Sequence, residues 1–179
     1  MFKPECLAVW EAGAQLSVDV ALSDLSDMAA AVSRVLRPQD FLLLQGDLGA
    51  GKTTLVSLMA RALGSQQLVA SPTFSLLNVI EIPTSGLQSI SRICHMDLYR
   101  IRRNQELLHL GLELEFNAST LAIIEWHDNV DVDGWSNFFE LTRCRKPRRV
   151  LTLSIENLAD SSMRRYSFGW SSFSELTSE

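Results

Sequence analysis

The sequence has few cysteines, and their positions exclude the sites that cysteine usually builds. There are three in 179 residues, Cys6, Cys94 and Cys144, an odd number at long separations. Zinc and redox sites need ligands a few residues apart, and disulfide frameworks belong to short secreted chains. We therefore expect buried or inert thiols in a reducing compartment. The three histidines are scattered and do not predict a zinc site either.

Long hydrophobic runs are also missing. No apolar run is long enough to cross a bilayer, and residues 1–5 lack the basic start and apolar core of a secretory signal. These absences predict a cytoplasmic protein with no membrane partner. Hydrophobic residues make up 46% of the chain and charged residues 21%, as in ordinary globular proteins. We expect one domain over residues 1–179, with a flexible C-terminal tail from about residue 169.

A general excess of positive charge is absent too. The net charge is −5, so indiscriminate binding to nucleic acid is not predicted. The cations are nevertheless clustered in two groups: Arg143, Arg145, Lys146, Arg148 and Arg149, then Arg100, Arg102 and Arg103. Each group has two open interpretations. It is a solvated loop or strand edge, or a local site for phosphate, RNA or an acidic partner surface.

A glycine-rich motif is the most informative stretch of the chain. It reads Gly46-Asp47-Leu48-Gly49-Ala50-Gly51-Lys52-Thr53, which fits the phosphate-binding loop pattern of Gly, four residues and Gly-Lys-Ser/Thr. The apolar run at 41–44 before it is typical of a buried strand. Residues 54–63 after it carry apolar side chains at three- to four-residue steps, as a helix does. Strand, glycine loop and helix in this order predict a nucleotide-binding site.

The residue types in this motif suit a triphosphate. Glycines let the backbone turn tightly and bring its N–H groups to phosphate oxygens, and the helix N-terminus adds donors and a partial positive charge. Lys52 can reach the β- and γ-phosphates, and Thr53 can offer its hydroxyl to Mg²⁺. The predicted nucleotide-binding residues in this stretch are Asp47, Leu48, Gly49, Ala50, Gly51, Lys52, Thr53 and Thr54.

The rest of the chain alternates between strand and helix patterns. We predict strands at 16–20, 75–82, 93–99, 121–124, 150–155 and 165–168, with the strands at 75–82 and 93–99 forming a hairpin. We predict helices from about 24 to 36 and from 105 to 110, the latter capped by Asn104. The stretch 127–139 has no clear period and receives no assignment. The pattern predicts an α/β, three-layer P-loop NTPase-like fold with a mixed, mostly parallel central sheet. The nucleotide then lies at the carboxyl ends of the strands.

Three residues outside the loop are candidates for chemistry. Glu125 follows the apolar run at 121–124, as the acidic residue of a Walker B segment does, although an ordinary strand-end carboxylate is the alternative. Asp97 lies among apolar residues and needs a partner, which a Mg²⁺-bound water, a hydroxyl or Arg100 would supply. Thr73 can sense the γ-phosphate through its hydroxyl, or 71–73 is only a turn.

Five motifs follow one another along the chain: the phosphate loop, Ser71-Pro72-Thr73-Phe74, His95-Met96-Asp97-Leu98-Tyr99-Arg100, Leu110-Gly111-Leu112-Glu113 and Ile124-Glu125-Trp126. Together they resemble the TsaE family, the small bacterial P-loop ATPase of the tRNA threonylcarbamoyladenosine pathway. The resemblance covers about residues 16–126. Many families share the phosphate loop, whereas the Ser-Pro-Thr-Phe and His-x-Asp-Leu-Tyr-Arg pair is much more specific.

The resemblance implies an ATPase with little activity alone. Such a protein joins a heterodimer of two related proteins, one of which transfers threonylcarbamoyl to adenosine in tRNAs that read codons beginning with A. The tRNA would contact the ATPase indirectly or weakly. A separate enzyme makes the threonylcarbamoyl-adenylate, and ATP hydrolysis serves the reaction cycle.

The resemblance also implies roles for individual residues. Thr53, Glu125 and Asp97 would serve Mg²⁺, Thr73 would belong to a switch-like loop, and Trp126 would lie near the nucleotide. The expected catalytic residues are Lys52, Glu125, Asp97 and Thr73. The chain departs from the family where His127-Asp128 replaces the usual Pro-Glu and where Asn78-Val79-Ile80 replaces Asn-Glu-Tyr.

The motifs leave rival functions to test against a magnesium-dependent ATPase. A small-molecule or nucleoside kinase would need an acceptor pocket and commonly an arginine-bearing lid, for which 143–149 is a candidate. A GTP-driven switch is disfavoured because the sequence has no Asn-Lys-x-Asp motif for guanine. A non-enzymatic nucleotide-binding module is disfavoured because Thr53, Asp97 and Glu125 are all present.

Overall fold

The computed structural model describes residues 15–83 and 89–173 of the chain. Seven strands form one sheet: β1 (Leu16–Ala21), β2 (Phe41–Gln45), β3 (Leu77–Glu81), β4 (Arg92–Asp97), β5 (Thr120–Glu125), β6 (Val150–Asn157) and β7 (Met163–Ser171). Four α-helices accompany them: α1 (Leu25–Val35), α2 (Lys52–Ala62), α3 (Leu112–Glu115) and α4 (Val132–Thr142). Among these described residues, no helix has both the length and the hydropathy to span a membrane.

The sheet is mixed, with a parallel centre and antiparallel edges. The strand order is β1-β7-β6-β2-β5-β4-β3. Strands β6, β2, β5 and β4 run parallel to their neighbours in that central block, whereas β3 pairs antiparallel with β4, and β7 pairs antiparallel with both β6 and β1. The predicted fold class is therefore confirmed, including the hairpin formed by β3 and β4.

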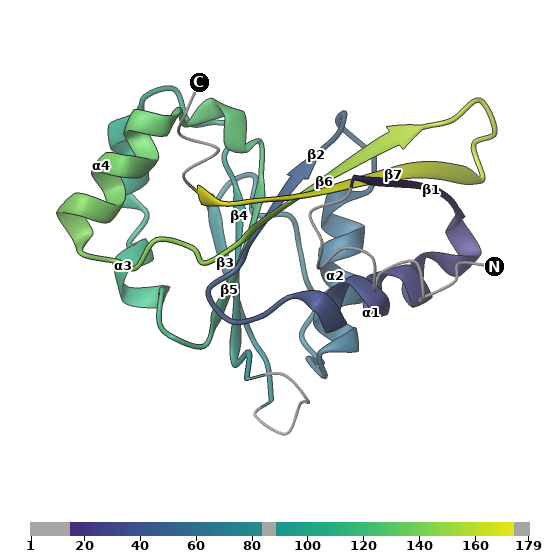
Figure 1. Ribbon diagram of the computed structural model, residues 1–179, viewed down its shortest axis with the longest axis horizontal. Coiled ribbons are helices and arrows are strands. Elements are labelled where there is room, and N and C mark those ends of the chain that lie inside the picture. Colours follow the sequence, from purple (N-terminus) through teal and green to yellow (C-terminus); the bar gives the residue numbers. More distant parts are fainter. Residues whose placement is uncertain (1–14, 84–88, 174–179) are drawn as a thin grey trace.

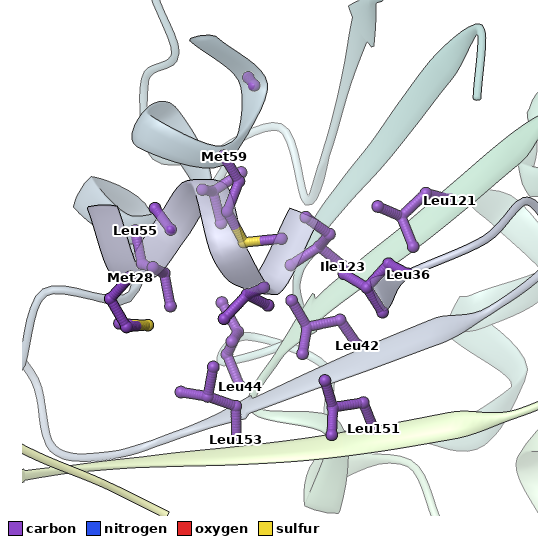
Figure 2. Packing of buried hydrophobic residues seen from close by; sticks show 14 of the residues in the cluster. Met28, Leu36, Leu42, Leu44, Leu55, Met59, Leu121, Ile123, Leu151 and Leu153 are labelled. Atoms are coloured by element: carbon purple, nitrogen blue, oxygen red, sulfur yellow. The ribbon is translucent and has the colours of Figure 1, made fainter. Parts of the chain in front are cut away.

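Helices cover both faces of the sheet, which gives three layers (Figure 1). Side chains alternate between faces along a strand, so Leu42 and Leu44 of β2 point toward α1 and α2. There they join a buried cluster that includes Met28, Leu55 and Met59 (Figure 2). Leu55 and Met59 are fully buried and one turn apart on α2. Truncating either residue to Ala would cost about 2–5 kcal/mol of stability.

The opposite face of the sheet carries an aromatic cluster. Phe41 of β2 contacts Trp135 and Phe139 of α4 at ring-centroid distances of 5.7 and 6.1 Å. Phe138 is fully buried beside them. Most of helix α4 lies in the stretch 127–139, which was left unassigned from the sequence. Asp131 caps it, because one of its carboxylate oxygens accepts a hydrogen bond of 2.8 Å from the Gly134 N–H.

Two expectations from the sequence were wrong in detail. Residues Asn104–His109 form the 3₁₀ helix η3 rather than an α-helix, and Asn104 donates to Asp131 at 2.6 Å instead of capping its own helix. The bond to Asp131 reaches α4 and fixes the side chain there. The expected tail from about residue 169 also begins too early, because β7 continues to Ser171 and Phe173 packs on Phe139 at 5.2 Å.

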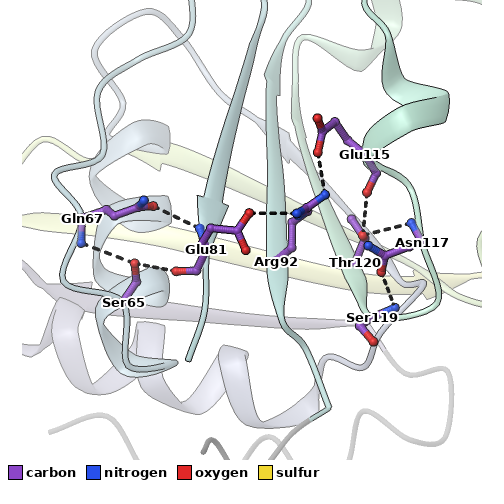
Figure 3. Close-up of polar contacts among 8 residues, drawn as sticks. All are labelled: Ser65, Gln67, Glu81, Arg92, Glu115, Asn117, Ser119 and Thr120. Atoms are coloured by element: carbon purple, nitrogen blue, oxygen red, sulfur yellow. Dashed lines mark hydrogen bonds and ion pairs between the residues drawn. The ribbon is translucent and has the colours of Figure 1, made fainter. Parts of the chain in front are cut away.

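A polar network ties the sheet together near the start of β4 and β5 (Figure 3). Arg92 donates to Glu81 at 2.9 Å and to Glu115 at 2.6 Å. The hydroxyl of Thr120 donates to the Glu115 carbonyl at 2.9 Å, and the Asn117 N–H donates to the same hydroxyl at 3.1 Å. The turn that leads into β5 is therefore held to the neighbouring strand by side chains.

Candidate functional site

The phosphate loop joins β2 to α2 at the carboxyl end of the parallel strands. Gly49 and Gly51 have φ values of +82° and +105°, a backbone conformation that favours glycine. Gly46 has φ +141°, and a Cβ atom there would lie 2.6 Å from the Ile155 carbonyl oxygen of β6. The motif needs glycine at these positions because the loop turns through left-handed backbone and passes close to a neighbouring strand.

Lys52 folds back into the loop that precedes it. Its Nζ donates to the carbonyl oxygens of Gly46 at 2.7 Å and Asp47 at 3.1 Å. The same ammonium lies 4.6 Å from the centre of the Trp126 ring, and Lys52 is only 5% exposed. A buried ammonium needs such partners. Phosphate oxygens can replace the two carbonyl groups, so the side chain is already placed beside the anion-binding loop.

Glu125 joins the loop to the end of β5. Its Oε1 accepts a hydrogen bond from the Thr53 hydroxyl at 3.0 Å and lies 2.8 Å from Nε2 of His95. His95 is fully buried, and its Nδ1 has no hydrogen-bond partner among the described residues. A proton on Nδ1 would leave a buried donor unsatisfied. Nε2 therefore carries a proton and donates it to Glu125.

Asp97 lies beside Glu125, because the two residues are register partners at the ends of β4 and β5. Its Oδ2 accepts a hydrogen bond from the Thr73 hydroxyl at 2.5 Å, and its Oδ1 accepts the Tyr99 N–H at 3.1 Å. The Ser71 hydroxyl lies 2.6 Å from that of Thr73. The buried carboxylate thus has hydroxyl and backbone partners, and the loop of Thr73 is attached to it.

These side chains surround a cavity of about 230 Å³. Its lining includes most of the residues singled out from the sequence: Leu48, Gly49, Gly51, Lys52, Thr53, Thr54, Thr73, Asp97, Glu125 and Trp126. Asp47 and Ala50 lie outside the lining, although both belong to the loop. The Ala50 N–H donates to the Asp47 carbonyl at 3.1 Å, so in this conformation it points into the loop itself.

Trp126 follows Glu125 in a left-handed conformation, with φ 56° and ψ 40°. That conformation turns the chain sharply at the strand end and places the indole ring against Lys52 and against Tyr99, whose ring centre is 5.1 Å away. The next residue, His127, lies 3.2 Å from Gln45 Nε2 through its own Nε2. Burial lowers the pKa of His127, while the nearby Asp128 opposes that effect.

The donor set of the cavity fits Mg²⁺. This ion prefers hard oxygen ligands and commonly binds through one or two carboxylates together with phosphate and water. Thr53, Asp97 and Glu125 offer a hydroxyl and two carboxylates in the lining of the cavity. The described part of the chain holds no group of three or more His, Cys, Asp or Glu side chains arranged for a metal. A site of the magnesium type, completed by phosphate oxygens, does not require one.

Two polar residues of the site were not assigned a role from the sequence. His95 was named only as part of a motif, although its position carried a signal. It lies two residues before Asp97 in a strand, so both side chains share a face. Ser71 bonds to Thr73 at 2.6 Å and also lines the cavity. Its contact depends on the folded loop and has no periodic signature.

Comparison with known proteins identifies the family. The family model described as "Threonylcarbamoyl adenosine biosynthesis protein TsaE" matches residues 21–161. The chain belongs to the TsaE family. A TsaE protein from Rickettsia typhi is 35% identical over 106 residues, which cover 59% of this chain and 69% of that protein. One from Bacillus subtilis is 37% identical over 90 residues, which cover 50% and 52%.

Two other matches cover more of the chain. The protein from Treponema pallidum is 29% identical over 143 residues, which cover 80% of this chain and 92% of that protein. The crystal structure of Bacillus subtilis YdiB superposes with a TM-score of 0.59 and 24% identity, and it covers 91% of each chain. This likeness supports the fold, and the phosphate loop on that fold fits nucleotide binding.

Proposed function

We propose that this chain is a magnesium-dependent ATPase. The hydrogen bond between Thr53 and Glu125 carries the proposal. These residues are 72 positions apart, yet they meet at 3.0 Å across one cavity, with Lys52 beside them. A phosphate loop brought against the carboxylate of a neighbouring strand is the arrangement that nucleotide hydrolysis by P-loop proteins uses.

Each residue has a distinct task in this proposal. The loop N–H groups and Lys52 hold the phosphates and neutralise the charge that grows as the bond from the γ-phosphorus to its bridging oxygen breaks. Glu125 orients the attacking water. Thr53 and His95 both contact its Oε1, so Oε2 is the oxygen that can accept a hydrogen bond from water. Thr73 reports the γ-phosphate to Asp97.

Mg²⁺ would be held by Thr53, Glu125 and Asp97, and it would reduce the negative charge of the phosphate oxygens. Trp126 contributes a ring beside Lys52, and this contact limits the access of water to the ammonium. All of these side chains line one cavity, so a single bound nucleotide can contact them together.

We further propose that hydrolysis serves threonylcarbamoyladenosine modification of tRNAs that read codons beginning with A. The relatives from Rickettsia typhi and Bacillus subtilis are named tRNA threonylcarbamoyladenosine biosynthesis proteins, which supports this pathway. The proposed partners are the threonylcarbamoyl transferase and its paralogue, acting as a heterodimer in the cytoplasm. Low activity alone and stimulation by these partners are the expected behaviour.

The test is steady-state ATP hydrolysis with Mg²⁺, alone and with the transferase heterodimer. Lys52→Ala should lower the rate on the order of 10²-fold or more, because the charge of the transferring phosphoryl group loses its ammonium. Glu125→Ala should remove stimulation by the heterodimer. Arg61→Ala, an exposed change at the far end of α2, is the matched control. Unchanged hydrolysis by Lys52→Ala would overturn the assignment.

A kinase would use the basic run at 143–149 as a lid over the nucleotide, but this run lies far from the phosphate loop. The basic run lies at the start of β2, where the Arg148 N–H donates to the Gln39 carbonyl, whereas the phosphate loop follows the end of β2. The five residues of β2 separate the two places by about 17 Å. A screen for phosphorylated small-molecule products in the same reaction would distinguish a kinase from a hydrolase.

A further inference from the structure

A second, larger cavity opens at the end of the sheet opposite the phosphate loop. Its volume is about 340 Å³, within the range of small-ligand sites, which is roughly 300–1,000 Å³. One wall is the turn after α4, from Thr142 to Arg145, and another is the turn into β5, around Asn117. Phe41 and Phe116 line it with aromatic carbon. Nothing in the proposed ATPase uses this cavity.

The mouth of this cavity is strongly cationic. Arg143 and Arg145 line it, and Lys146 and Arg148 follow in the same exposed turn. None of these four side chains forms an ion pair with a carboxylate in the described parts of the chain. We call these four residues the cationic turn. Because the whole protein has a net charge of −5, this local excess favours a polyanion at one place only.

The nearby Arg149 is not part of the cationic turn, since its charge is already used. It donates to Asp40 at 2.6 and 3.1 Å and to the Val35 carbonyl at 2.9 Å. Its guanidinium also lies 4.3 Å from the Trp170 ring centre. This pairing fixes the C-terminal end of the turn to the sheet. Arg143, Arg145 and Arg148 are therefore exposed on an anchored segment, and the ammonium of Lys146 lies 5.6 Å from the centre of the Phe173 ring.

The polar lining of the cavity suits a nucleobase. Glu113 offers acceptor oxygens. Asn117 uses its Oδ1 to accept the Ser119 N–H at 2.8 Å, and the same bond is drawn in Figure 3, so its amide N–H groups remain for a ligand. A base edge presents both donors and acceptors, and its faces stack on aromatic rings. Glu113 would repel a carboxylate that entered the cavity, whereas an uncharged base can donate a hydrogen bond to it.

We propose that this end of the molecule binds single-stranded RNA. The phosphates lie along the cationic turn, where the planar guanidinium groups of Arg143, Arg145 and Arg148 suit phosphate oxygens. One unstacked base enters the cavity against Phe116, with Glu113 and Asn117 at its edge. In this proposal the chain itself contacts RNA, at a place separate from the nucleotide cavity. The RNA site therefore goes beyond the proposed ATPase activity and does not depend on that activity.

The experiment measures RNA binding without ATP and without partner proteins. The full chain is titrated into a fluorescein-labelled single-stranded RNA of about 12 nucleotides, and fluorescence anisotropy is followed at several salt concentrations. The triple variant Arg143→Ala, Arg145→Ala, Arg148→Ala should weaken binding about tenfold or more. It should also lower the slope of log K against log salt by about 2, since each lost phosphate contact on a single strand contributes about 0.7.

Two further variants separate the cavity from the charge. Ala118→Trp places a ring in the cavity lining at an exposed position and leaves every charge in place. It should weaken RNA binding severalfold with an unchanged salt slope. Arg61→Ala removes an exposed arginine of α2, on the other face of the sheet, and should bind RNA as the wild type does.

Cys144 provides a readout that does not depend on charge. It lines the cavity and is partly exposed, whereas Cys94 is fully buried. Bound RNA should slow alkylation of Cys144, followed on its own peptide by mass spectrometry. RNA binding by the triple variant equal to that of Arg61→Ala would overturn the proposal. Displacement of the RNA by polyglutamate as readily as by unlabelled RNA would also overturn it, in favour of an acidic protein partner.

Discussion

His95 is the residue whose importance the folded protein makes clearest. It lies under the proposed catalytic carboxylate and donates to the same oxygen of Glu125 that the Thr53 hydroxyl contacts. With this oxygen held twice, the carboxylate has one orientation and presents its other oxygen to the cavity. His95 is therefore a positioning residue that acts through Glu125, since it is fully buried beneath it.

Replacing His95 should separate catalysis from nucleotide binding. His95→Leu removes the donor while keeping an apolar side chain of similar size, and we expect magnesium-dependent hydrolysis to fall about 10- to 100-fold. His95→Gln can place an amide N–H near the former Nε2 and should restore part of the rate. Binding of a fluorescent ATP analogue should change little in either variant. Equal rates for the Leu and Gln variants would contradict this role.

The buried thiol of Cys94 leads to a prediction about stability at alkaline pH. Burial, aided by the negative charge of Glu115, raises the pKa of its thiol from an ordinary 9.0 to about 12. The unfolded chain releases this proton first, so the contribution of Cys94 to the free energy of unfolding is lost as the pH rises from about 9 to 12. The loss should approach about 1.4 kcal/mol per pH unit.

Urea unfolding of the wild type and Cys94→Val across this pH range isolates that contribution. The variant should lose less stability than the wild type above pH 9, whereas Cys144→Ser should follow the wild type. Parallel pH curves for the wild type and Cys94→Val would show that ionisation of Cys94 is not involved.

At the scale of single elements, α4 depends on its first turn and on what it packs against. Asp131 accepts from the Gly134 N–H at 2.8 Å and from the Asn104 side chain at 2.6 Å. A Cβ at Gly134 would lie 2.6 Å from Cγ of Asn104, so the close approach of η3 and α4 requires glycine there. Asp131 therefore both caps α4 and holds η3 against it.

Removing the cap of α4 should lower thermal stability. Asp131→Ala is expected to reduce the Tm by about 2–4 °C, whereas Asp131→Asn keeps an acceptor and should cost less. The Asn104 side chain and the Gly134 N–H lower the pKa of Asp131. The benefit of its charge is present above the ordinary pKa of 3.8 and is lost as the pH falls through the lower folded value. The Tm difference between wild type and Asp131→Ala should therefore narrow in acid.

The contrast between elements shows what sequence patterns can predict. The strand at 121–124 and the hairpin strands were predictable, because apolar runs and alternation are local signals. Helix α4 carries aromatic residues at helical spacing, but Asp133, Gly134 and Asn137 are weak helix formers that obscure the pattern. Burial of Trp135 and Phe138 overrides that propensity, and the sheet face that buries them lies far away in sequence.

The candidate site divides in the same way. The phosphate loop, Glu125 and Asp97 stand in motifs with fixed spacing, so they could be selected from the sequence. The contact between His95 and Glu125 depends on β4 lying next to β5, and sequence alone does not give that strand order. The cavity beside the cationic turn likewise needs two turns that are adjacent only in the fold.

At the scale of the whole molecule, the ion pair between Asp40 and Arg149 connects several elements at one end of the sheet. Asp40 is 1% exposed and accepts from Arg149 with both oxygens, while the Arg37 N–H donates to it at 2.7 Å. Arg149 also contacts the end of α1 through the Val35 carbonyl. The end of α1 and the segments before β2 and β6 therefore meet at this ion pair.

Breaking this pair should destabilise the whole fold. Arg149→Met leaves the buried Asp40 without its cation and should lower the free energy of unfolding by about 2–4 kcal/mol. Adding Asp40→Asn removes the unpaired charge, so the double variant should recover part of that loss. Urea denaturation of the two variants measures both effects. A double variant less stable than Arg149→Met would contradict the proposed cause.

The pairing of β1 with β7 determines when the protein can finish folding during synthesis. Leu16 pairs with Phe168, near the other end of the described chain. In the nucleotide site, Glu125 lies 72 residues after Thr53, from whose hydroxyl it accepts a hydrogen bond. At about 5–20 residues per second, the ribosome makes the phosphate loop roughly 4–14 s before Glu125. Strand β1 waits longer still for its only sheet neighbour in the described chain. A nascent chain therefore carries an exposed strand edge until β7 emerges, and its nucleotide site forms late in translation.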